Sequence, residues 1–166
     1  EISLGLVGSE MCIRDRKYDD AEKCLKKAIQ YKRDMKEAHN DLVMVLRKKG
    51  DHKSALKVCE HALKKHDSDD TLHRNRGNIL YAMDEPEKAL ESFEKALDLN
   101  PYVVDTWVNK GTVMWKAMED RDGALAAFDK ALEINPNFMA AVDSRIALEA
   151  EIKANRPSFF KRLFGG

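Results

Sequence analysis

The sequence predicts an all-α protein built from repeated helical hairpins. Two series of small residues carry that prediction. The first recurs at intervals of 34, 34 and 35 residues, at Ala21, Ala55, Ala89 and Ala124. The second follows seven residues behind it, at Ala28, Ala62, Ala96 and Ala131. A period of this length is the signature of stacked repeat units, each of which needs its neighbours to bury its apolar face.

The residues between the two series complete one face of a helix. A packing residue stands between the two alanines of each unit, at Leu25, Cys59, Phe93 and Phe128. Steps of three, four and seven bring side chains to the same side of a helix. Small residues allow two helices to cross closely, and larger residues fill the spaces beside the crossing. Each of these helices is therefore expected to pair with the helix that precedes it.

Turn signals divide the chain between the helices. Gly50, Pro86, Pro101 and Pro136 stand at or beside such breaks, where glycine and proline end or start helices. The resulting helix estimates are 18–33, 36–49, 52–65, 70–82, 86–98, 104–117, 121–134 and 138–154.

The repeat unit that contains Trp107 and Gly111 continues with Ala124, Phe128, Ala131 and Pro136, and the unit before it has Gly77, Ala89, Phe93, Ala96 and Pro101. In these residues the chain resembles the tetratricopeptide repeat family over roughly residues 17–138. An earlier unit departs from the pattern, because Val43 replaces the glycine, Cys59 the phenylalanine and Asp67 the proline.

The resemblance implies a right-handed superhelical solenoid of about three full repeats, a half repeat and a C-terminal capping helix. The array would occupy residues 17–138 and the cap residues 139–154. It also implies a non-catalytic scaffold or adaptor that binds a protein or peptide in a concave groove lined by the first helix of each hairpin. By register with the family, the groove residues are Arg47, Arg74, Asn75, Asn78, Tyr81, Asn109, Thr112 and Trp115.

The chemistry of the predicted groove residues suits a peptide. An asparagine side chain both donates and accepts hydrogen bonds, so Asn75 and Asn109 are expected to hold a peptide backbone. Arg47 and Arg74 can pair with a carboxylate. Tyr81 and Trp115 offer the rigid aromatic area of binding hot spots.

One subgroup of the family grips acidic chaperone tails with a two-carboxylate clamp. Arg74, Asn78 and Asn109 match the first three places of that clamp, but its last two basic places fall on Ala140 and Ser144. The clamp is therefore incomplete. A weaker contact with an acidic or polar peptide stays open.

Both ends of the chain stand apart from the array. Residues 1–16 show no helical stripe, and two interpretations are open: translated sequencing-adapter DNA at the edge of an assembly, or a natural but irregular lead-in. Residues 155–166 form an amphipathic or disordered tail. Its Phe159, Phe160, Leu163 and Phe164 share one face of a short helix, with Lys161 and Arg162 opposite. Such a tail folds back on the cap, docks a partner or contacts a membrane.

Composition excludes several other classes of protein. Lysine plus arginine equals aspartate plus glutamate at 29 each, so no overall charge favours nucleic acid. Three cysteines without a CxxC pair argue against a zinc site or disulfide framework, and we expect a reducing cytoplasm. Five histidines at poor metal spacing and the lack of a phosphate loop or nucleophile motif predict no metal, no cofactor and no enzyme. The alternatives are a membrane-peripheral assembly factor tethered by the tail, or a fragment of a larger repeat protein.

Overall fold

The computed structural model describes residues 18–32 and 35–155, and within them the chain forms α-helices and no strand. The helices are α2 (Tyr18–Tyr31), α3 (Lys36–Lys48), α4 (His52–Leu63), α5 (Asp70–Ala82), α6 (Pro86–Leu99), α7 (Val104–Lys116), α8 (Arg121–Ile134) and α9 (Met139–Asn155). Every bound lies within two residues of its sequence estimate. Residues 1–17, 33–34 and 156–166, which include the predicted lead-in and tail, lie outside this description.

Local side-chain chemistry explains where several helices begin. The carboxylates of Asp51, Asp69 and Asp120 each accept a hydrogen bond from a backbone N–H in the first turn of α4, α5 and α8, at 3.1, 2.8 and 2.9 Å. Such N-caps satisfy one of the amides that a helix start leaves open. Helix α6 instead starts with Pro86, whose missing N–H costs nothing at that position.

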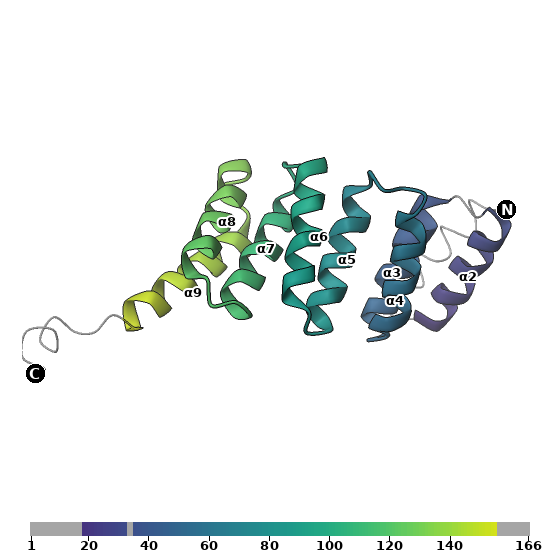
Figure 1. Cartoon of the computed structure of the whole chain (residues 1–166), viewed down its shortest axis with the longest axis horizontal. Coiled ribbons are helices and arrows are strands. Elements are labelled where there is room, and N and C mark those ends of the chain that lie inside the picture. Colours follow the sequence, from purple (N-terminus) through teal and green to yellow (C-terminus); the bar gives the residue numbers. More distant parts are fainter. Residues whose placement is uncertain (1–17, 33–34, 156–166) are drawn as a thin grey trace, which may run out of the picture. The chain divides into compact units, whose positions relative to one another are not determined.

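The chain divides into two compact units between Pro101 and Tyr102. In unit 1, α3 pairs with α4 and α5 with α6, while α4 and α3 also contact α5 and α2 packs on α3 (Figure 1). In unit 2, α7 pairs with α8 and α9 contacts both of them. Each unit is thus made of helical hairpins that pack on the next helix in sequence, as the periodicity predicted.

The recurring alanines lie at the helix crossings. Ala21, Ala55, Ala89 and Ala124 are each 0% exposed. Of the second series, Ala62, Ala96 and Ala131 are buried as well, while Ala28 is half-buried. The prediction that small side chains permit close helix packing is confirmed.

Each hairpin has a pair of facing positions, one on its first helix and one on its second. The hairpins fill this pair in two different ways. Gly77 and Gly111 stand so close to a phenylalanine of the second helix that an added Cβ would lie 2.6 Å from Cε1 of Phe93 and 2.7 Å from Cε1 of Phe128. In the earlier hairpin the same places hold Val43 and Cys59, both fully buried. In this hairpin the larger side chain is on the first helix and the smaller one is on the second. This exchange of size explains why that unit keeps the fold while departing from the family pattern.

The turn inside each complete hairpin contains one left-handed residue. Gly50, Asp84 and Glu119 have φ angles of 79°, 63° and 55° and occupy equivalent places in the three hairpins. Glycine adopts this conformation without strain, whereas a residue with a Cβ does so at a cost. Only the first of these turns uses the residue that suits it best.

Helix α9 packs within unit 2 through Ala141 and Leu148, which are fully buried. Its opposite side is apolar and exposed, since Met139 is 64% and Ile146 is 58% accessible. Ile146 stands 35 residues after Gly111. It therefore occupies the place that faces a second-helix phenylalanine in the two hairpins before it.

Candidate functional site

Helix α5 presents a row of polar and aromatic side chains. Arg74, Asn78 and Tyr81 follow one another at steps of four and three residues, which places them on one face of the helix. Arg74 and Asn78 are half-buried, and Tyr81 is exposed. None of the three side chains donates or accepts a hydrogen bond with another residue in the described part of unit 1. This face therefore keeps free hydrogen-bonding capacity.

Arg47 reaches the same region from α3 and is held by a relay of side chains. Its Nη1 donates to Oδ1 of Asn75 at 3.3 Å, and Nδ2 of Asn75 donates to Oδ1 of Asn40 at 3.3 Å. Asn75 is only 8% exposed. With both ends of its amide engaged and little accessible surface, Asn75 positions Arg47. The sequence predicted a contact between this amide and a peptide backbone, and Asn75 has little accessible surface for it.

Two positive charges, those of Arg47 and Arg74, lie close to each other at this place. Burial, and next the positive charge of Arg74, lower the pKa of the Arg47 guanidinium, although an arginine stays protonated at any physiological pH. Within residues 18–32 and 35–155, neither guanidinium makes an ion pair. The Nε of Arg74 is also buried without a hydrogen-bond partner. We call Arg47, Arg74, Asn78 and Tyr81 the first-helix surface.

The predicted groove residues of unit 2 lie on α7. Asn109 is half-buried, and its side chain makes no hydrogen bond with another described residue. The hydroxyl of Thr112 donates to the carbonyl of Val108 at 2.8 Å, one turn back along its own helix. Asn109 thus keeps its donor and acceptor, whereas the hydroxyl hydrogen of Thr112 is already used.

Trp115 takes part in the packing of α9 on α7. Its Nε1–H donates to Oε2 of Glu151 at 2.8 Å, and Arg121 binds the other oxygen of that carboxylate at 2.9 Å. The indole ring also meets the ring of Phe128 edge to face, with 6.5 Å between centroids. These two hydrogen bonds lower the pKa of Glu151. We therefore leave Trp115 out of the proposed binding surface.

Sequence reasoning missed the partners that decide these roles. Asn40 accepts a hydrogen bond from Asn75, and Glu151 accepts one from Trp115. Both contacts join helices that are far apart in the sequence. Spacing predicts which face a residue occupies, but the hydrogen bonds that its side chain makes depend on the facing helix. The predicted tail residues Phe159, Phe160, Leu163 and Phe164 lie outside the described residues.

Among the described residues, no three histidine, cysteine, aspartate or glutamate side chains gather closely enough to hold a metal ion. Burial raises the pKa of the Cys59 thiol to about 12, and its Sγ–H donates to the carbonyl of Leu72 at 3.2 Å. A thiol in this state is a poor nucleophile. None of the described helices is long and apolar enough to cross a bilayer.

Hairpins that repeat in register, with small residues at every crossing, define a helical-repeat protein of the kind used for protein interaction. Three models of one family, each described as tetratricopeptide repeat, match residues 13–79, 71–102 and 104–138. The chain belongs to the tetratricopeptide repeat family. No curated protein matches it.

Solved structures of similar fold include several proteins with such repeats. YrrB, described as a TPR protein with an unusual peptide-binding site, is 23% identical; the match covers 87% of this chain and 74% of YrrB, with a TM-score of 0.73. MamA from Desulfovibrio magneticus RS-1 is 18% identical over 92% of this chain and 85% of that one, with a TM-score of 0.77. A thermophilic TPR protein from Thermus thermophilus is 17% identical over 97% of this chain and 94% of that one, with a TM-score of 0.75. These similarities establish the all-α repeat fold.

Proposed function

We propose that this protein is a non-catalytic adaptor that binds an extended peptide carrying a carboxylate group on the first-helix surface of unit 1. Arg47 and Arg74 hold the carboxylate. Asn78 offers an amide to the peptide backbone, and Tyr81 packs against a neighbouring side chain. In unit 2, Asn109 on α7 is a separate candidate contact for a peptide backbone.

The observation that carries this proposal is the pair of arginines, neither of which forms an ion pair with a described residue. Two guanidinium groups on adjacent first helices raise each other's electrostatic energy, and the buried Nε of Arg74 lacks an acceptor. A carboxylate relieves both problems, because it accepts charge-assisted hydrogen bonds from a guanidinium fork. The relay through Asn75 and Asn40 fixes Arg47 before the peptide arrives, which reduces the ordering cost of binding.

We also propose where the adaptor works, that it needs no cofactor, and which class of partner it binds. The adaptor works in the cytoplasm, needs no metal or cofactor, and binds protein in preference to nucleic acid. The balance of 29 basic and 29 acidic residues supports this last choice, since nucleic-acid binding depends on an excess of positive charge. YrrB offers a precedent for a peptide-binding site on this fold.

An array of acidic, neutral and basic peptides tests the proposal. The protein is expected to retain acidic peptides, and the double variant Arg74→Ala, Tyr81→Ala is expected to retain them more weakly while its circular dichroism stays helical. Salt should weaken the wild-type signal, because charge contributes to the contact. Undiminished retention by the double variant would reject the first-helix surface.

Lys95→Ala provides the matched control. Lys95 is exposed on α6 and makes no ion pair within the described chain, so its loss removes one positive charge away from the site. Retention of acidic peptides should be unchanged in this variant. An equal loss in both variants would show that net charge alone attracts the peptides.

A further inference from the structure

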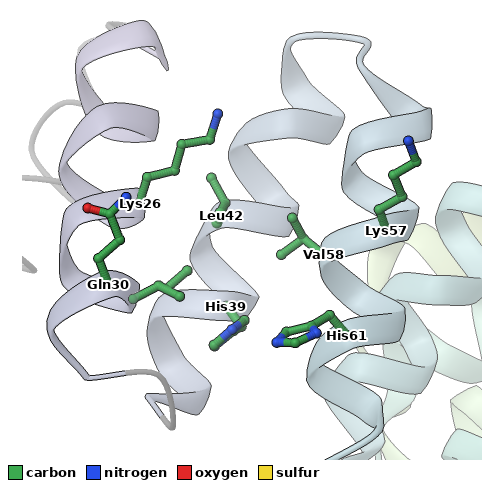
Figure 2. A pocket seen from close by; sticks show the side chains of 8 residues that line it. Lys26, Gln30, His39, Leu42, Lys57, Val58 and His61 are labelled. Atoms are coloured by element: carbon green, nitrogen blue, oxygen red, sulfur yellow. The ribbon is translucent and has the colours of Figure 1, made fainter.

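Unit 1 contains a pocket of about 360 Å³ on another face, between α2 and α4 with α3 as its floor. Figure 2 shows Lys26 and Gln30 on α2, His39 and Leu42 on α3, and Lys57, Val58 and His61 on α4. Ile29 completes the lining. We call this the α2–α4 pocket. Its volume suits one or two side chains of a ligand.

The α2–α4 pocket and the first-helix surface use different faces of α3. His39 and Leu42 point into the pocket, whereas Asn40 and Arg47 belong to the relay described above. On a helical wheel, Leu42 lies about 160° from Asn40. The pocket is therefore separate from the site of the proposed function.

The floor of the pocket is apolar, and its rim carries basic side chains. Ile29, Leu42 and Val58 supply apolar surface, and none of the described lining residues carries a carboxylate. Lys26 pairs with Glu22 at 2.6 Å, but Lys57 makes no ion pair within residues 18–32 and 35–155. The ring of His39 is fixed by a hydrogen bond from Nδ1 to the carbonyl of Met35 at 2.9 Å, and it lies 6.1 Å from the ring of His61.

The equivalent place one repeat later shows what this pocket lacks. Thirty-four residues on, Leu42 is replaced by Arg76, Val58 by Ser92 and Lys57 by Glu91. Arg76 donates to the hydroxyl of Ser92 at 2.7 Å and stands 4.0 Å from a carboxylate oxygen of Glu60. There the chain fills the space with its own side chain and provides carboxylates at the rim. Among the described residues of the α2–α4 pocket, neither a side chain like Arg76 nor a carboxylate at the rim is present.

We propose that the α2–α4 pocket is a second binding site for a peptide in which an apolar side chain is flanked by aspartate or glutamate. The apolar side chain rests on Leu42, Val58 and Ile29. A flanking carboxylate pairs with Lys57, in the way that Glu60 meets Arg76 one repeat later. Charge complementarity selects the acidic flank, because the described lining supplies the cation Lys57 without an ion-pair partner and no anion.

Fluorescence anisotropy with two labelled peptides tests this site. One probe has a leucine flanked on each side by two aspartates, and the other has the same leucine flanked by lysines. The wild-type protein should bind the acidic probe at least about tenfold more tightly than the basic one. The variant Lys57→Glu, Val58→Ser places the residues of the next repeat at the rim. It should weaken binding of the acidic probe by about tenfold or more.

Two controls separate this pocket from the first-helix surface. Lys95→Glu makes the charge change of Lys57→Glu at an exposed position on α6 and should leave binding unchanged. In an Arg74→Ala background, which removes the first-helix surface, the acidic probe should still bind and should still be weakened by Lys57→Glu, Val58→Ser. A loss in Arg74→Ala with no loss in the Lys57 variant would place the probe on the first-helix surface, which overturns the second site and leaves the proposed function standing.

The remaining outcomes also decide the matter. Failure of the acidic probe to bind, or equal binding of both probes, overturns the proposal. So does an equal loss in the Lys57 and Lys95 variants. Vesicles containing phosphatidylserine form a further arm: if they bind the wild-type protein but not the Lys57 variant, while the acidic probe stays free, the pocket faces lipid and the peptide proposal fails.

Discussion

Gly77 faces Phe93 so closely that a Cβ on the glycine would stand 2.6 Å from the phenyl ring. The glycine is therefore needed for the space that its hydrogen leaves, on a helix where glycine is otherwise a poor choice. Val43 and Cys59, at the same places one repeat earlier, show that the opposite distribution of volume also packs.

This relationship predicts strong coupling between the two positions. Gly77→Val alone should destabilise the protein by roughly 3 kcal/mol through overpacking, and Phe93→Cys alone by a similar amount through a cavity. The double variant copies Val43 and Cys59, so its cost should fall at least about 1 kcal/mol below the sum. Urea denaturation of the four proteins measures this cycle. Strict additivity would show that the two arrangements are not interchangeable.

The left-handed turn residues predict stabilising substitutions. Glu119→Gly should raise the free energy of unfolding by about 1 kcal/mol, because it removes the Cβ from a backbone with φ of 55°. Asp84→Gly should gain less, since aspartate tolerates this conformation better than glutamate does. Thermal denaturation measures both changes. Gly50→Ala, the reverse substitution at the equivalent turn, should destabilise, and an opposite sign in either direction would contradict the argument.

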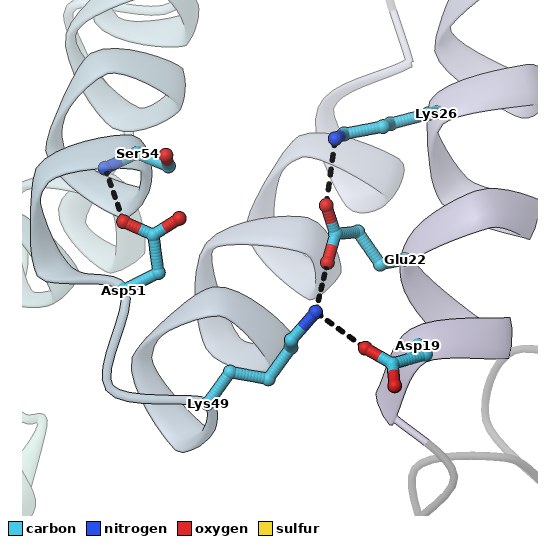
Figure 3. Close-up of polar contacts among 6 residues, drawn as sticks. All are labelled: Asp19, Glu22, Lys26, Lys49, Asp51 and Ser54. Atoms are coloured by element: carbon cyan, nitrogen blue, oxygen red, sulfur yellow. Dashed lines mark hydrogen bonds and ion pairs between the residues drawn. The ribbon is translucent and has the colours of Figure 1, made fainter.

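The ion-pair network between α2 and the end of α3 predicts sensitivity to acid. Lys49 Nζ lies 2.6 Å from Asp19 and 2.5 Å from Glu22, and Glu22 also binds Lys26 (Figure 3). Hydrogen bonds from these lysines lower the pKa of both carboxylates. A carboxylate with a lowered folded-state pKa stabilises the fold above its ordinary pKa of about 4. That stabilisation is lost as the pH falls through the folded-state value.

The Lys49→Met variant checks the origin of this acid sensitivity. Its urea midpoint should drop less between pH 7 and pH 3 than the midpoint of the wild-type protein does. The pKa of Lys49 itself is raised, so its own titration lies far above this range. Lys27→Met, which removes a nearby exposed lysine, should leave the wild-type pH dependence in place. Identical pH profiles for wild type and Lys49→Met would remove the network as the cause.

The unpaired arginines predict that binding and stability oppose each other. Arg74→Met keeps a long apolar stem but removes the buried Nε and the charge near Arg47. We expect the free energy of unfolding to rise by roughly 1 kcal/mol, since one buried unsatisfied donor disappears. Retention of acidic peptides should fall in the same variant. Arg74→Lys should gain less stability, because it keeps the positive charge beside Arg47. A loss of stability in Arg74→Met would mean that the arginine already has adequate partners.

The periodic residues predicted most of the fold. The repeated alanines identified the helices that cross closely, and the turn signals at glycine and proline placed the ends of every described helix within two residues of those observed. The departures at Val43 and Cys59 looked like weak repeat signals in the sequence, and only the facing pairs Gly77–Phe93 and Gly111–Phe128 explain them.

The candidate site was harder to predict, since it depends on contacts between hairpins. Register placed Asn75 and Trp115 on the first-helix face, but Arg47, Asn40 and Glu151 decide what those side chains do. The α2–α4 pocket had a signal in the sequence: Leu42 aligns with Arg76 and Val58 with Ser92. An alignment of the repeats that compared these positions as well as the alanines would have identified the pocket.

The relay from Asn40 through Asn75 to Arg47 sets a limit on how this protein can be re-engineered. Randomising the side chains of this relay together with the first-helix surface would remove the hydrogen bonds that hold Arg47 as well as the old specificity. A library that varies Arg74, Asn78 and Tyr81 while it holds both asparagines constant should return folded clones with an ordered basic anchor. Changing either asparagine would let the Arg47 side chain adopt many rotamers. Ordering that side chain on binding would then cost affinity.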